Sequence, residues 1–268
     1  MEIGISLSTL RELCASSVFS ALSFFLVSLL CASVADWILR WSLLDPKRLA
    51  GTSSISQTSS PSSTSISAGG PMKTAALGFR VHSGWTSLIA LALENNQPVV
   101  LARQRPHLVA IFSYTFRQPY HTAEKMDLAE AQSFLDQQRD EAQVLALSAL
   151  RAAQTEVAQQ GYKLTRAALL LASGRPLPEL PTILASHSMI HTADGEFFRQ
   201  ALLYACARGD LAVTKIKERE LLATASTTLR RRPPALTRFV NDLGKPLGSP
   251  WTQDEKFATL AAWLALAE

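Results

Sequence analysis

The chain has 268 residues and a formal charge of +4, with 47% hydrophobic residues and only 18% charged residues. Soluble domains usually carry about 25% charged residues, and this composition excludes collagen-like, coiled-coil, disulfide-scaffold and wholly disordered proteins. Residues 1–71 hold as many acidic as basic residues, so residues 72–268 account for the whole positive charge. We therefore expect a single soluble domain at 72–268, preceded by an unusually apolar leader at 1–48.

The leader contains an uncharged apolar stretch at 14–35, which is long enough to cross a bilayer of about 30 Å. Three explanations remain open for it: a transmembrane anchor, a signal peptide, or a start codon placed too far upstream of Met72. The basic residues that follow the stretch predict a cytoplasmic domain, tethered to the inner face of the membrane if 14–35 is translated and retained.

A Ser- and Thr-rich segment at 49–71 separates the leader from the domain. No charged residue lies between Arg48 and Lys73. Such a segment cannot bury enough apolar surface to offset the entropy lost on ordering, so it predicts a disordered linker.

Three strands are expected at the start of the domain, at 74–82, 86–93 and 98–105. These runs are apolar or alternating and are separated by short turns, a pattern typical of an antiparallel meander. A long helix follows. Asp127 is placed to cap it, and apolar residues recur every three or four positions until about Gln160.

The second half of the domain alternates between strands and helices. Strands are expected at 164–172 and 211–216. Helices are expected at 180–208, with Thr192 or Asp194 opening its clearest part, and at 218–229, 235–242 and 252–267. The last helix begins with a capping box, and its alanines would let it pack closely on a sheet. This order predicts an α/β fold with a mixed sheet and helices on both faces.

The order of elements resembles the ribonuclease H-like superfamily, which includes Holliday-junction resolvases and actin-like ATPases. The resemblance covers most of 74–267 and rests on topology, without a specific motif. It implies, for nucleases, an Asp on the first strand and a second carboxylate at the end of the fourth, which together hold two metal ions.

The carboxylates implied by this resemblance are missing from both strands. The first strand offers only 78–82 (GFRVH), and the fourth offers only 169–173 (LLLAS). Asp254, near the start of the last helix, could match a late carboxylate of the family. A conventional two-metal nuclease and an actin-like ATPase are therefore both disfavoured.

The candidate catalytic residues lie between 186 and 196. His187 and His191 would share one helix face at i, i+4, a spacing that can bind a metal ion, and Asp194 or Glu196 could add a carboxylate. This set suits zinc, iron or manganese. The histidines could also act as acid–base groups. In a purely structural alternative, Thr192 and Asp194 cap a helix.

Two further groups are candidates for ligand binding. One surrounds the turn after the first strand, and the other lies in an expected loop near 117–121, where functional residues are common. Their members are Arg80, His82, Ser83, Trp85, Arg117, Tyr120 and His121.

If these groups converge at one end of the sheet, they form a pocket suited to phosphate or carboxylate. The favoured function is therefore binding of nucleic acid or of a phosphate-bearing small molecule, without the two-metal carboxylates. The alternatives are a hydrolase that depends on the histidines, with or without a metal ion, and a non-catalytic interaction domain tethered to the membrane. The sequence identifies no cofactor.

Overall fold

The computed structural model describes residues 72–172 and 176–267. The predicted leader, its apolar stretch at 14–35 and the linker at 49–71 lie outside the described residues. None of the described helices combines the length and the apolar composition needed to span a membrane.

Five strands and a series of helices make up the described residues. The strands are β1 (Lys73–His82), β2 (Trp85–Glu94), β3 (Gln97–Gln104), β4 (Tyr162–Leu171) and β5 (Ala212–Lys217). The α-helices are α3 (Tyr114–Arg117), α4 (Pro119–Ala123), α5 (Leu128–Gln159), α6 (Leu180–Leu184), α7 (His187–Arg208), α8 (Leu221–Thr228), α9 (Pro233–Leu243) and α10 (Gln253–Ala267). Two short 3-10 helices cover Glu218–Glu220 and Lys245–Leu247.

The strands form one mixed sheet in the order β3-β2-β1-β4-β5. The β1–β2 and β2–β3 pairs are antiparallel, whereas β1–β4 and β4–β5 are parallel. The predicted meander and the predicted strand–helix units are both confirmed. Because β1, β4 and β5 run in one direction, their carboxyl ends meet at the same edge of the sheet.

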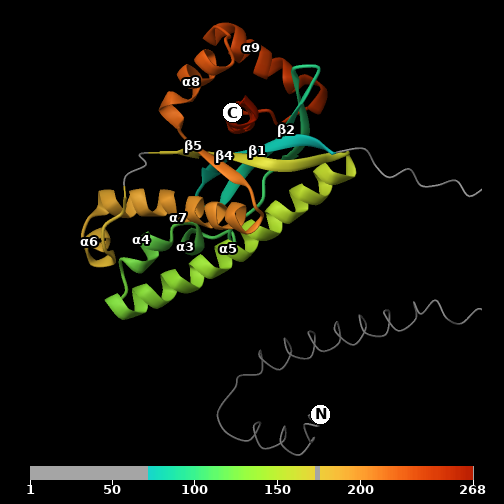
Figure 1. Ribbon diagram of the computed structural model, residues 1–268. Coiled ribbons are helices and arrows are strands. Elements are labelled where there is room, and N and C mark those ends of the chain that lie inside the picture. The colour runs from blue at the N-terminus through green and yellow to red at the C-terminus, as the bar shows by residue number, and fades with distance from the viewer. Residues whose placement is uncertain (1–71, 173–175, 268) are drawn as a thin grey trace, which may run out of the picture. The chain divides into compact units, whose positions relative to one another are not determined.

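Helices cover both faces of the sheet, as Figure 1 shows, with α8 and α9 on one side and α4, α5 and α7 on the other. Alternate residues of β1 supply the two cores. Leu77 and Phe79 pack with the layer of α5 and α7, whereas Ala76 packs with α8, α9 and α10. The sheet therefore has a hydrophobic core on each face, which confirms the predicted α/β class.

Helix α10 lies directly against the sheet, as its small residues predict. Ala258, Ala261, Ala262 and Ala265 are fully buried. At Gly78 of β1, a Cβ atom would overlap the carbonyl oxygen of Ala258. Backbone therefore packs on backbone here, and glycine is the residue that β1 needs at this point.

Helix α5 begins and ends where the sequence predicts. The Asp127 carboxylate accepts a hydrogen bond from the backbone N–H of Glu130 at 2.8 Å, which satisfies one free donor of the first turn. Gly161, with φ of +85°, turns the chain into β4.

Two local predictions were wrong. The segment around 117–121 is helical, because Pro119 begins α4 at a position where proline suits a helix. Thr192 and Asp194 do not cap a helix, because α7 already begins at His187 and both residues lie inside it. Tertiary contacts of Asp194 explain its interior position.

We expect Gly78→Ala to destabilise the domain by about 3 kcal/mol, because neither backbone can move aside without disturbing the layer. Urea unfolding measures this loss. Gly195→Ala on α7 is the matched control, since the nearest atom to its new Cβ is the end of the Arg199 side chain at 3.4 Å. Equal unfolding midpoints for the two variants would contradict the close contact.

Candidate functional site

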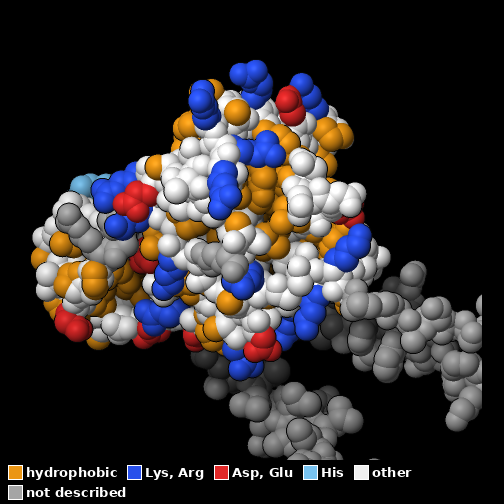
Figure 2. Space-filling model, turned by 45° about the horizontal axis from the view of Figure 1, so that its top comes forward, with side chains coloured by type: hydrophobic (Ala, Val, Ile, Leu, Met, Phe, Trp, Pro, Cys, Tyr) orange, Lys and Arg blue, Asp and Glu red, His pale blue; other side chains and the backbone are white. Residues whose placement is uncertain are grey.

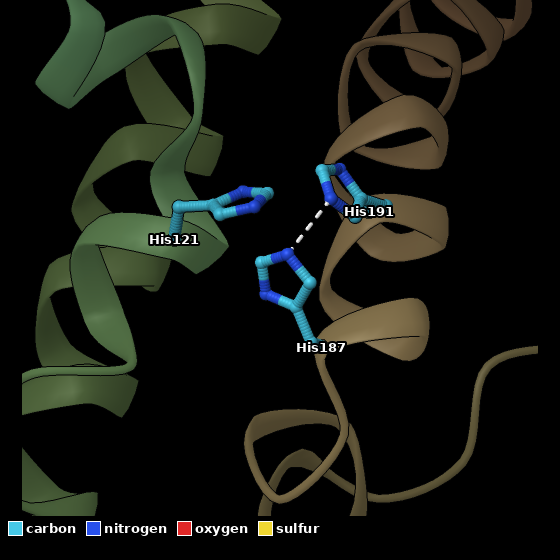
Figure 3. Close-up of side chains that lie close together, drawn as sticks. All are labelled: His121, His187 and His191. Atoms are coloured by element: carbon cyan, nitrogen blue, oxygen red, sulfur yellow. Dashed lines mark hydrogen bonds between the residues drawn. The ribbon is translucent and has the colours of Figure 1, made fainter.

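Three histidines form a compact group between α4 and α7, here called the histidine cluster (Figure 3). His121 comes from α4, and His187 and His191 come from successive turns of α7. The ring centroids lie 4.5 Å apart for His121 and His191, and 5.4 Å apart for His121 and His187. Nε2 of His187 lies 3.1 Å from Nε2 of His191.

Asp194 lies behind this cluster in the buried contact between the two helices. Its carboxylate binds Nδ1 of His121 and accepts a hydrogen bond from the backbone N–H of Tyr120 at 2.7 Å. Burial raises the pKa of the Asp194 carboxyl, and the hydrogen bonds from His121 and Tyr120 act in the opposite direction. Asp194 thus orients His121 and fixes α4 on α7.

Glu196 lies beside the cluster rather than in it. Its Oε2 is 3.7 Å from Nη1 of Arg199, and it lines a hollow of about 260 Å3 together with His191 and Arg199. Arg199 is buried and donates to the carbonyl oxygen of Leu170 at 3.0 Å, and burial lowers its pKa. The same arginine lines a neighbouring hollow of about 550 Å3, and Ala172, which follows the carboxyl end of β4, lines both hollows.

An ion-pair network lies at the carboxyl end of β1. Arg80 makes two hydrogen bonds to Glu218, of 3.0 and 2.7 Å, and an ion pair with Asp254. Nε2 of His82 lies 2.9 Å from Asp254, and Nη2 of Arg105 lies 3.1 Å from the other oxygen of Asp254. The side chains of Arg80 and His82 therefore meet the same carboxylate, as alternate positions on a strand require.

Asp254 carries the negative charge on which this network depends. Burial acts to raise the pKa of its carboxyl, but His82 and Arg80 together bring that pKa below its ordinary value of 3.8. Three cationic or protonatable side chains thus surround this one carboxylate.

Two stacks of flat side chains cover the surface next to the network. In the Trp85 stack, His82 lies on Trp85 with centroids 4.3 Å apart, and the Arg105 guanidinium lies 4.1 Å from the Trp85 ring. The Phe112 stack consists of His107, Phe112 and Arg117: the His107 ring and the Arg117 guanidinium each lie 4.4 Å from the Phe112 ring. The stacks face a shared hollow of about 230 Å3.

The fold brings the two ligand-binding groups of the sequence together. Nε of Arg117 donates to the carbonyl oxygen of Ser83 at 3.1 Å, and the Arg117 side chain packs over Gly84. His121 lies instead in the histidine cluster. The Tyr120 ring points into the core, where it packs edge-on against Phe197 at 6.1 Å.

Sequence reasoning missed several members of this surface. They are Arg105, His107, Phe112, Tyr114 and Glu218. One signal was present: an arginine and a histidine two residues apart close β1 and also follow β3, at Arg80/His82 and Arg105/His107. A second signal was the adjacent apolar pair Ile111 and Phe112, whose side chains prove to be 62% and 44% exposed in the structure.

The lowered pKa of Asp254 gives a testable pH dependence. We expect Asp254→Asn to lower the free energy of unfolding at pH 7 by about 1–3 kcal/mol, since the variant leaves partly buried cations without their partner. A carboxyl whose folded pKa is depressed contributes stability above its unfolded pKa and loses it as the pH falls through the folded value.

The difference between wild type and Asp254→Asn should therefore shrink on acidification below about pH 4. Urea unfolding over a pH series measures it. Asp242→Asn is the control, because Asp242 forms an exposed pair with Lys245 at 2.7 Å, which contributes about 1 kcal/mol or less. A pH-independent difference for Asp254→Asn would contradict the assignment.

Comparisons with known proteins find similarity in structure alone. No protein-family model matches the chain, and no curated protein matches it in sequence. The T. thermophilus RuvC in complex with a Holliday junction substrate is similar with a TM-score of 0.42 and 9% identity, covering 72% of this chain and 93% of that chain.

Two further solved structures are similar. A second Thermus thermophilus RuvC structure has a TM-score of 0.40 and 10% identity, and covers 72% of this chain and 93% of that chain. The yeast mitochondrial Holliday junction resolvase Ydc2 has a TM-score of 0.37 and 9% identity, and covers 75% of this chain and 79% of that chain. At 9–10% identity, these are likenesses of fold alone.

Proposed function

We propose that this domain binds single-stranded nucleic acid, with one unpaired base entering the hollow between the Trp85 stack and the Phe112 stack. The observation that carries the proposal is the alternation of cations and aromatic rings on both sides of that hollow. Proteins that bind single strands combine these two features, because rings stack on bases while cations attract phosphates.

The size of the hollow suits one base. Its volume of about 230 Å3 is smaller than the roughly 300–1,000 Å3 of pockets that hold drug-sized ligands. The walls are the flat side chains of Trp85, Arg105, His107 and Phe112. Stacking on such side chains is worth about 1–3 kcal/mol per base and tolerates any base, because every base has a π-face.

Arg117 is the best-placed phosphate ligand. Its guanidinium lies on Phe112 and donates one hydrogen bond to the chain, and none of the carboxylates in 72–172 and 176–267 forms an ion pair with it. Figure 2 shows Lys and Arg scattered over the visible face rather than gathered into one broad patch. The affinity would therefore depend on stacking as much as on charge.

The ion-pair network supports binding rather than two-metal cleavage. The resemblance implies carboxylates on β1 and at the end of β4, but the end of β1 carries Arg80 and His82, and β4 ends in apolar residues. The one late carboxylate, Asp254, is already bound by Arg80, His82 and Arg105. Two metal ions would have to displace all three side chains.

We expect Phe112→Ala to weaken the binding of a single-stranded oligonucleotide of about 16 nucleotides by about 5- to 150-fold, because one base loses its stacking partner. Fluorescence anisotropy with the full-length chain measures the dissociation constant. Phe112 is 44% exposed, so its loss should leave the fold intact. Arg117→Gln should reduce the slope of log K against log salt concentration by about 0.7.

Matched controls come from exposed residues of α5 that do not line the hollow. Val144 is 67% exposed, and Val144→Ala should bind the oligonucleotide like wild type. Arg151 is also exposed, and Arg151→Gln should keep the wild-type salt slope. Absence of binding by wild type at low salt would refute the proposal, as would equal affinities for Phe112→Ala and Val144→Ala.

A further inference from the structure

The histidine cluster has the composition of a metal site. We propose that His121, His187 and His191 bind one Zn2+ ion and leave a fourth coordination position open to solvent. The proposal stands whether or not the domain binds nucleic acid, because it uses none of the stacked side chains.

The spacing of the three nitrogens supports the proposal. One nitrogen of each ring lies within 4.8 Å of the other two, and the Nε2 atoms of His187 and His191 are 3.1 Å apart. In a tetrahedral site with Zn–N bonds of about 2.0–2.1 Å, neighbouring ligand atoms lie about 3.4 Å apart. The pair on α7 is already close to this separation, and His121 faces it from α4 (Figure 3).

The contact between Asp194 and His121 is a second, independent observation. Histidines that bind metals almost always donate their other ring N–H to a carboxylate, a carbonyl or water. Asp194 holds Nδ1 of His121, so Nε2 is the nitrogen that faces the other two rings. The backbone N–H of Tyr120 holds the same carboxylate in turn, at 2.7 Å. The ligand and its support are therefore both fixed before a metal ion arrives.

Charge also favours a cation in this cluster. Asp194 is only 4% exposed, and within the described part of the chain no lysine or arginine forms an ion pair with it. Burying a carboxylate is costly unless a positive charge compensates it. A divalent ion on the opposite side of the His121 ring supplies that charge.

The choice of Zn2+ follows from the donors. Three imidazoles suit zinc, whereas Mg2+ and Ca2+ prefer oxygen ligands, and no carboxylate belongs to the set. His187 and His191 are exposed, and His191 lines the hollow of about 260 Å3. Three protein ligands with one accessible position are typical of catalytic rather than structural zinc sites.

The test uses the full-length chain without a histidine tag, stripped of metal by a chelator and titrated with Zn2+ in a calorimeter. We expect one Zn2+ per chain and no heat of binding for Mg2+. His191→Ala should bind Zn2+ at least a hundredfold more weakly. Asp194→Asn should bind about 10–100-fold more weakly, because it loses only the support of His121.

His107→Ala is the matched control, because His107 is an exposed histidine outside the cluster and should leave the zinc affinity unchanged. The exposed position of His191 on α7 makes its alanine variant compatible with folding, which circular dichroism checks. Uptake of less than one Zn2+ by wild type would overturn the proposal, as would equal affinities for His191→Ala and His107→Ala.

Discussion

The close contact between Gly78 and α10 is the constraint on which the arrangement of charges depends. Because the helix backbone lies directly on β1, the first turn of α10 reaches the carboxyl end of that strand. Asp254 thereby meets Arg80 and His82. Glu255 is fully buried beside it, where its carboxylate accepts a hydrogen bond from the backbone N–H of Thr252 at 2.7 Å. The small residues that let α10 pack closely on β1 thus also determine where the Asp254 carboxylate lies.

The arginines at this edge of the sheet fall into two kinds, those bound by a carboxylate and those without such a partner among the described residues. Arg80 is committed to Glu218 and Asp254, with its side chain 16% exposed, so it acts within the fold. Arg117 lies on Phe112 without a carboxylate partner among the described residues, so it remains available to a ligand. Arg231, in the basic run at 230–232, lies on the rings of Phe239 and Trp263 and is likewise structural. Counting basic residues would not distinguish these roles.

Features that depend on neighbouring residues could be predicted from the sequence, whereas contacts between residues far apart in the chain could not. Asp127 and Gly161 act on their own helix or on the next turn, and the alanines of α10 recur along one helix, so each was interpretable from spacing alone. Asp194 was not, because its partners His121 and Tyr120 lie more than 70 positions earlier in the chain. The pairing of His187 with His191 follows from helical periodicity, but the third ring comes from another helix and has no sequence signal.

The two hydrogen bonds between Asp194 and α4 also restrict how α4 can move relative to α7. Helix α4 has only five residues, too few to be stable in water without tertiary support. Both of its links to Asp194 end on one carboxylate, so α4 cannot shift along α7 without losing both together. The segment should therefore open as one cooperative unit, and its amide protons should exchange with solvent at a common rate, set by a single local equilibrium rather than by unfolding of the whole sheet.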